Sequence, residues 1–147
     1  MIFFGDKTVA LFDLWSLEHF FTGCNTAALL TFFSKKYLRE YDQKSQALFQ
    51  VMLMILLELF WEIIEHYLEA GISIDAITHW FQGVEYFWNR VLCDPIITVS
   101  GLFFIRKFPR VKIFAAVFSV VWLYVNIFVY SDCMGLNRDL IALISNM

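Results

Sequence analysis

The 147-residue sequence has few charged residues, few glycines and very few prolines. Charged residues make up 17% of the chain and hydrophobic residues 60%, and there are only six glycines and two prolines. So few turn-forming residues argue against a loop-rich or all-β fold. The charged fraction is also below the roughly 25% that is typical of soluble domains. The composition therefore predicts an integral membrane protein, with the lipid bilayer as a partner.

The sequence also lacks an excess of positive charge and a disulfide framework. The net charge is -3, so there is no basic surface of the kind that holds nucleic acid, and we expect no nucleic-acid partner. The cysteines are odd in number and widely spaced, which predicts buried free thiols. They are Cys24, Cys93 and Cys133.

Long hydrophobic stretches are what the sequence does contain. Each is long enough to cross a bilayer of about 30 Å as a helix that rises about 1.5 Å per residue. The stretches run over about residues 9–33, 47–68, 84–105 and 111–130. We therefore predict an all-α, polytopic bundle of four transmembrane helices that forms a single membrane domain. Gly23 and Ala27 form a small-xxx-small pair that lets two helices approach closely.

Basic residues indicate the orientation of this bundle. They gather between the first and second stretches and again between the third and fourth, whereas residues 69–83 contain no Lys or Arg. By the positive-inside rule, the two basic loops face the cytoplasm and both termini lie on the other side.

The C-terminal tail, residues 135–147, has the pattern of a short amphipathic helix. It suits either the membrane interface or the surface of a membrane-protein partner. Its expected apolar face holds Leu136, Leu140, Ile141 and Ile144, and its expected polar face holds Asn137, Arg138 and Asp139.

Ionisable residues within the hydrophobic stretches are the main candidates for function, because a charged group in a bilayer costs several kcal/mol. Glu58, Glu62 and Glu65 fall within about 60° of one another around a helix, so they share one face. Given the predicted topology, polar groups of the first three helices meet at one depth, in the non-cytoplasmic half. Arg90 alone cannot balance these acids. Either some of them stay protonated, or a cation or a cationic ligand group is present.

Acidic residues near the helix ends have a simpler interpretation. We expect them to extend to the lipid headgroups without entering the site. They are Asp13, Glu18, Glu69 and Glu85.

Three uses fit the remaining polar residues. In the first, a small enzyme or binding protein acts on a lipid or lipid-linked cell-envelope substrate, with His19 or a Glu as base and Arg90 on a phosphate. In the second, the chain is a non-catalytic subunit or assembly factor of a larger membrane complex. In the third, one or two divalent metal ions bind between the helices. The candidate catalytic residues are His19, Glu58, Glu62, Glu65 and Asp94; the candidate substrate-binding residues are Asn89, Arg90 and Asp75; the candidate metal ligands are His19, Glu62, Glu65 and His66.

Asp75, His79 and Trp80 lie in the acidic loop over the expected mouth of this site. They are candidates for a lid or a partner surface, and a plain interfacial Trp anchor is the alternative.

The order of these motifs resembles a family of small bacterial membrane proteins, DUF2585 (UPF0314), and more distantly the VanZ-like proteins. The motifs are Ser16-Leu-Glu-His19-x-x-x-Gly23, Glu58-x-x-Trp61-Glu62-x-x-Glu65, Ile72-Ser-Ile-Asp75, Asn89-x-x-x-x-Asp94-x-x-x-x-x-x-Gly101, and Pro109 after a basic pair. The resemblance covers about residues 13–109. The sequence departs from the family pattern at His66 and at Arg90, and these two residues add cationic or metal-binding capacity. The resemblance implies a polytopic protein of the bacterial inner membrane. The association of VanZ-like proteins with the cell envelope favours a lipid-linked substrate by analogy.

Overall fold

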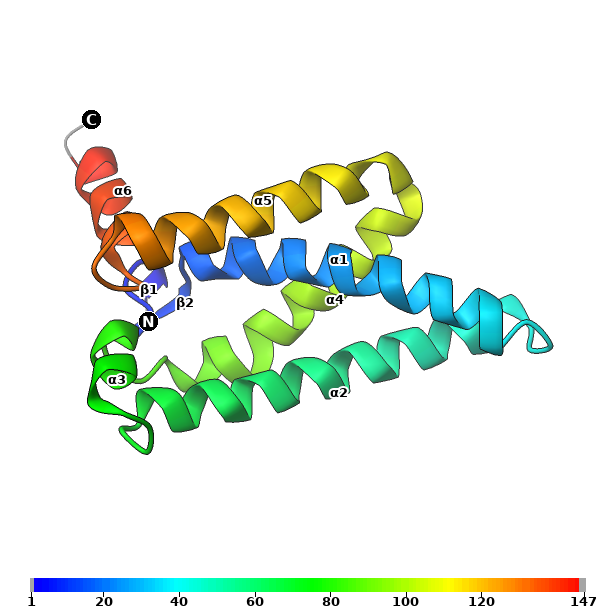
Figure 1. Ribbon diagram of the computed structural model, residues 1–147, viewed down its shortest axis with the longest axis horizontal. Coiled ribbons are helices and arrows are strands. Elements are labelled where there is room, and N and C mark those ends of the chain that lie inside the picture. The colour runs from blue at the N-terminus through cyan, green and yellow to red at the C-terminus, as the bar shows by residue number, and fades with distance from the viewer. Residues whose placement is uncertain (1, 146–147) are drawn as a thin grey trace.

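The computed structural model describes residues 2–145 and is mostly helical, which confirms the predicted all-α class. Helix α1 lies in the middle of the molecule, between α5 and α2, and packs most extensively against α4 (Figure 1). Within the described residues the helices are α1 (Leu14–Tyr37), α2 (Gln43–Glu69), α3 (Asp75–Phe81), α4 (Asp94–Lys107), α5 (Lys112–Tyr124) and α6 (Gly135–Ser145). Shorter helical segments are the π-helices η1 (Asn89–Cys93) and η3 (Val125–Val129) and the 3₁₀-helix η2 (Pro109–Val111).

Within the described residues, two helical segments are long and apolar enough to cross a membrane. They are α2 and the segment formed by η2, α5 and η3, which runs from Pro109 to Val129. Helix α1 has 24 residues, about 36 Å at 1.5 Å per residue, but carries polar side chains such as His19 and Asn25 along its length. The π-helix η1 leads directly into α4 and carries Arg90 and Asp94.

The helix ends differ from the predicted ones by a few residues because polar caps set them. Helix α1 begins after Asp13, whose carboxylate accepts hydrogen bonds from the N–H groups of Trp15 and Ser16. Helix α2 begins after Asp42, which accepts hydrogen bonds from the N–H groups of Lys44 and Ser45. Aspartate is a favoured N-cap residue because its side chain satisfies N–H groups that have no partner inside the helix.

The π-helical turn η1 leads into helix α4, directly before Pro95. The N–H of Asp94 bonds to the carbonyl oxygen of Asn89, five residues earlier. Pro95 has no N–H, so it cannot continue the usual ladder of α-helical bonds at this position. The wider turn places Asn89, Arg90 and Asp94 together on the buried side of the helix. Such π-bulges are frequent at functional sites.

Small residues bring α1 and α4 into close contact. A Cβ atom on Gly23 would lie 2.2 Å from the Thr98 carbonyl oxygen, and one on Gly101 would lie 2.5 Å from the Phe20 carbonyl oxygen. The apolar core is built around this crossing. It contains Cys24, Ala27, Leu30, Met54, Leu102, Ile105 and Ala115.

The two chain ends meet at one end of the bundle. Strands β1 (Ile2–Phe4) and β2 (Ala10–Phe12) form a short parallel pair that sequence patterning did not predict. Helix α6 confirms the predicted tail helix as far as residue 145, while residues 146–147 lie outside the described part. Its Asn137 does not face outwards as predicted. It is buried, donates to the Gly5 carbonyl oxygen and accepts from the Leu14 N–H, so it fastens α6 to the N-terminal segment.

All three cysteines are buried and free, as predicted. Cys133, in the turn before α6, donates from its thiol to the Phe81 carbonyl oxygen. Burial raises the pKa of this thiol to about 12. The thiol of Cys133 therefore stays protonated, and unreactive, at neutral pH.

Candidate functional site

The candidate site is a buried group of charged and amide side chains between α1, α2 and η1. We call it the polar cluster. Its members are Lys7, His19, Glu58, Glu62, Glu69, Glu85, Asn89, Arg90 and Asp94, all of them buried. Such burial of charge is rare unless the groups are paired.

His19 is the centre of the inner half of the polar cluster. Its Nδ1 lies 2.6 Å from Oε1 of Glu58 on α2. An ionised Glu58 only accepts hydrogen bonds, so Nδ1 is the donor whenever Glu58 is ionised. Nε2 lies on the other side of the ring from Glu58. There Nε2 lies 3.8 Å from Oε1 of Glu62 and 3.9 Å from Oδ2 of Asp94.

Arg90 is the centre of the outer half. Its Nε donates to Oε2 of Glu62 at 3.3 Å, and Nη2 donates to Oε2 of Glu69 and lies 3.5 Å from Oε2 of Glu85. The Glu69 carboxylate also binds Nζ of Lys7, from the loop between the strands. The guanidinium is thus already shared among three carboxylates.

The polar cluster contains more acids than cations. Two of its members, Lys7 and Arg90, are permanently charged at neutral pH, and His19 can carry one more positive charge. They face five carboxylates of the polar cluster, and Asp13 is buried at the adjacent end of α1. Neutrality in a medium of low dielectric constant therefore requires additional protons or an additional cation.

Several polar atoms at the middle of the polar cluster make no hydrogen bond within the described part of the chain. Among them are Oε1 of Glu62, Oδ2 of Asp94 and Oδ1 of Asn89. Buried acceptors without a donor cost roughly 1–3 kcal/mol each, so their convergence needs an explanation. The two carboxylate oxygens both face Nε2 of His19.

The structure brings together most of the residues singled out from the sequence. Glu65 is half-buried on α2. His66 is exposed, and its Nδ1 lies 3.1 Å from Nη1 of Arg90, so it touches the outer edge of the polar cluster. Asp75 and His79 are exposed on α3. Trp80 is held against the bundle, because its Nε1 donates to the Asn126 carbonyl oxygen and its ring packs edge-on against Trp15.

The expectation that the acids at the helix ends extend to the headgroups is wrong for three of them. Asp13, Glu69 and Glu85 are buried, and only Glu18 is half-exposed, where it accepts a hydrogen bond from Thr22. Glu69 could have been identified, because eleven residues at 100° each return it to the face of Glu58. Lys7 had no such signal, because it precedes the first helix.

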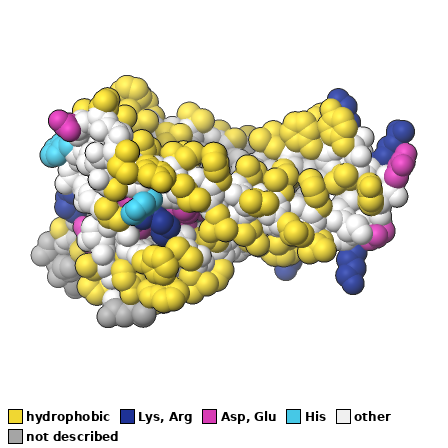
Figure 2. Space-filling model, turned by 90° about the horizontal axis from the view of Figure 1, so that it is seen from below, with side chains coloured by type: hydrophobic (Ala, Val, Ile, Leu, Met, Phe, Trp, Pro, Cys, Tyr) yellow, Lys and Arg dark blue, Asp and Glu magenta, His cyan; other side chains and the backbone are white. Residues whose placement is uncertain are grey.

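Histidine, basic and acidic side chains reach the surface at one place on the face shown in Figure 2, among hydrophobic side chains that cover most of that face. His66, which contacts the buried Arg90, is exposed. Neighbouring positions in the sequence carry exposed apolar side chains, including Trp61 and Ile63 on α2 and Phe87 and Val91 near Arg90.

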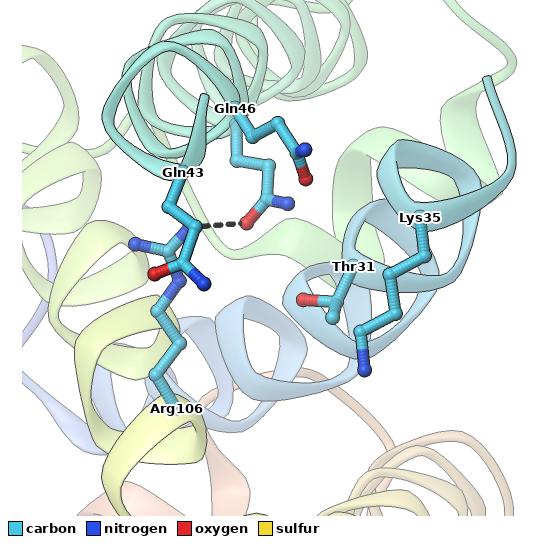
Figure 3. Close-up of a pocket in the computed structure, with 6 residues that line it drawn as sticks. Thr31, Lys35, Gln43, Gln46 and Arg106 are labelled. Atoms are coloured by element: carbon cyan, nitrogen blue, oxygen red, sulfur yellow. Dashed lines mark hydrogen bonds between the residues drawn. The ribbon is translucent and has the colours of Figure 1, made fainter. Parts of the chain in front are cut away.

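A second polar feature lies at the opposite end of α1. It is a cavity of about 360 Å³ between α1, α2 and α4, lined by Thr31, Lys35, Gln43, Gln46, Gln50 and Arg106. Figure 3 shows Thr31 and Lys35 on one side of the cavity and Gln43 and Arg106 on the other. Arg106 donates to Oε1 of Gln50 at 2.6 Å. The cavity belongs to the basic end of the chain and offers donors to an anion, a feature that the sequence analysis did not identify.

Comparison with known proteins adds no assignment: no protein-family model, no curated protein and no solved structure matches this chain.

Proposed function

We propose that this chain is a four-span membrane protein whose polar cluster binds a lipid or lipid-linked molecule. One observation carries the membrane placement: ionisable side chains are buried inside the fold and apolar side chains are exposed on its surface, the reverse of a protein that folds in water. Asp94 is 0% exposed and Glu62 is 2% exposed, whereas Ile113 is 69% and Phe128 72% exposed. Such a distribution is unfavourable in water and favourable in a bilayer, where apolar side chains face lipid and ionisable groups face the bundle interior.

The four spans of the proposal are α1, α2, η1 with α4, and the segment 109–129. The basic connections lie between α1 and α2 and between α4 and α5, which by the positive-inside rule face the cytoplasm. Both termini and the polar cluster then lie towards the non-cytoplasmic side of a bacterial inner membrane.

Reporter fusions to the C-terminus of the full chain test this orientation. We expect alkaline phosphatase fused after residue 147 to be active in bacterial cells, and green fluorescent protein at the same position to be dark. Each reporter folds in one compartment only, so the pair controls for expression. If the green fluorescent protein fusion is fluorescent and the alkaline phosphatase fusion is inactive, the orientation is the opposite of the one proposed.

The surface beside His66 supports a ligand that enters from the bilayer. Figure 2 shows charged and histidine side chains at the surface among hydrophobic ones, and an apolar surface of this kind is the environment that acyl chains occupy. His66 and Nη1 of Arg90, which donates to no carboxylate within residues 2–145, are the groups that would meet a phosphate, and the excess of carboxylates suits a ligand that also carries positive charge. Glu58 orients the His19 ring so that Nε2 faces Glu62 and Asp94 inside the polar cluster.

Photolabelling tests the ligand. Purified protein in nanodiscs is exposed to photoactivatable phosphatidylethanolamine, whose headgroup carries both a phosphate and an ammonium. We expect labelling near His66, reduced about tenfold in Glu62→Gln, because a charged contact of about 1.4 kcal/mol is lost. Glu18→Gln, the same change on α1 outside the polar cluster, should label as the wild type does. Equal labelling of both variants would contradict the proposal.

The same experiment distinguishes lipid binding from the alternative proposal, in which the chain is a non-catalytic subunit of a larger complex. A subunit tolerates Glu62→Gln and co-purifies with its partner through exposed side chains, such as Leu143 and Ile144 of α6. The resemblance to the DUF2585 and VanZ-like families supports the lipid-linked proposal by analogy and remains a prediction.

A further inference from the structure

We propose that His19, Glu62 and Asp94 form a binding site for one divalent transition-metal ion. The proposal deepens the proposed function and rests on it, because the ion would lie within the same polar cluster. It is argued from ligand geometry, and its test does not depend on lipid binding.

The distances fit an ion and do not fit direct hydrogen bonds. Nε2 of His19 is 3.8 Å from Oε1 of Glu62 and 3.9 Å from Oδ2 of Asp94, beyond the range of an N–H···O bond. Two atoms that each bind one ion at about 2.1 Å lie at most about 4.2 Å apart. Each of the two nitrogen–oxygen pairs, Nε2 with Oε1 of Glu62 and Nε2 with Oδ2 of Asp94, therefore lies within the distance at which both atoms can bind one ion. Both oxygens are fully buried and make no hydrogen bond within residues 2–145.

Each of the three proposed ligand side chains also has a hydrogen-bond partner at an atom other than the proposed ligand atom. Glu58 accepts from Nδ1 of His19, Arg90 donates to Oε2 of Glu62, and Ser16 donates to Oδ1 of Asp94 at 3.4 Å. Metal-binding histidines and carboxylates are usually oriented by second partners of this kind. Within residues 2–145, the carboxylate oxygens of Glu62 and Asp94 that face Nε2 of His19 have no hydrogen-bond partner.

Charge and ligand type indicate the class of ion. One imidazole with carboxylates suits zinc, iron or manganese, in contrast to the all-oxygen sites of calcium and magnesium. A carboxylate oxygen of Glu85 lies within 4.8 Å of oxygens of Glu62 and Asp94, which offers a fourth ligand. A divalent ion also offsets the excess of acids in the polar cluster. His66, which the sequence analysis placed among the metal ligands, faces Arg90 and lies outside this set.

Elemental analysis of protein purified in detergent without chelator is the direct test. We expect zinc, iron or manganese close to one ion per chain, or one Co²⁺ taken up on titration of the stripped protein with a visible d–d spectrum. Glu62→Gln and Asp94→Asn should lose the ion, and Glu18→Gln should keep it. Glu58→Gln keeps an acceptor for His19 and is expected to fold, with Co²⁺ affinity reduced about tenfold.

The outcomes separate this inference from the proposed function. Protein without metal that also takes up no Co²⁺ overturns the metal site, even if it is labelled by the lipid. Metal that persists in Glu62→Gln and Asp94→Asn, or Co²⁺ affinity unchanged in Glu58→Gln, also overturns it. Metal-loaded protein that the lipid does not label contradicts the lipid proposal alone. Circular dichroism of each variant identifies any loss of ion that follows from unfolding.

Discussion

Replacing Gly101 with alanine is expected to destabilise the bundle by about 3 kcal/mol. The new Cβ would lie 2.5 Å from the Phe20 carbonyl oxygen and 2.8 Å from the Cys24 backbone nitrogen. Both obstacles are backbone atoms of α1, so no side-chain rotation relieves the contact and the two helices must separate. In a bilayer, close packing of this kind is a main source of helix association.

Titration with SDS in mixed micelles, followed by circular dichroism, measures this loss of stability. Ser100→Ala is the matched control, because Ser100 is the exposed neighbour on the same helix and its hydroxyl bonds only within α4. We expect the control to lie within about 0.5 kcal/mol of the wild type. An unfolding midpoint of Gly101→Ala that equals that of Ser100→Ala would show that α1 and α4 do not cross at these glycines.

Arg90→Gln is expected to cost about 3–5 kcal/mol, because it removes the cation shared by three buried carboxylates. The loss exceeds the value of any one pair, since Glu62 and Glu85 would both lose a positive partner in a medium of low dielectric constant. Lys7 still neutralises part of the charge on Glu69. The same SDS titration gives the free energy of unfolding.

Two further variants define the cause of this loss. Arg110→Gln, on the exposed segment η2, removes one positive charge without changing the polar cluster and should lie within about 0.5 kcal/mol of the wild type. Arg90→Gln with Glu85→Gln should be more stable than the sum of the single changes predicts, by about 0.5–3 kcal/mol, because the second change removes an unpaired acid. Strict additivity would contradict a direct interaction between Arg90 and Glu85.

Helical periodicity was sufficient to predict the long helical segments and to single out the residues of the inner half of the candidate site, but it missed α3, which lies in a segment predicted to be a loop. Glu58 and Glu62 recur at the spacing of one helix face, and His19 and Asp94 interrupt apolar stretches. Both signals can be recognised from the sequence alone. The closeness of Gly23 to another helix could also be anticipated from its spacing to Ala27, although its partner, Thr98 on α4, could not.

The outer half of the site depended on contacts that local patterns do not encode. Lys7 reaches Glu69 across 62 positions of the chain, and its segment has no helical period from which a direction could be inferred. Glu69 and Glu85 have the sequence context of helix ends, which predicts headgroup contact. Instead Lys7 and Arg90 hold Glu69 inwards, and Asn89 and Arg90 hold Glu85. The exact position of Arg90 and Asp94 depends on the π-helical turn before Pro95, which shifts the register by a residue.

The contact between the first and last segments of the chain has a consequence for biosynthesis. Asn137 binds the carbonyl oxygen of Gly5, and Trp15 donates to the carbonyl oxygen of Cys133. These contacts join residues more than 100 positions apart, so they form only after nearly the whole chain has left the ribosome. The contacts between α6 and the N-terminal segment are therefore completed at the end of synthesis, whereas Lys7 can already bind Glu69, and its carbonyl oxygen can accept from the N–H of Tyr86, before α6 is made.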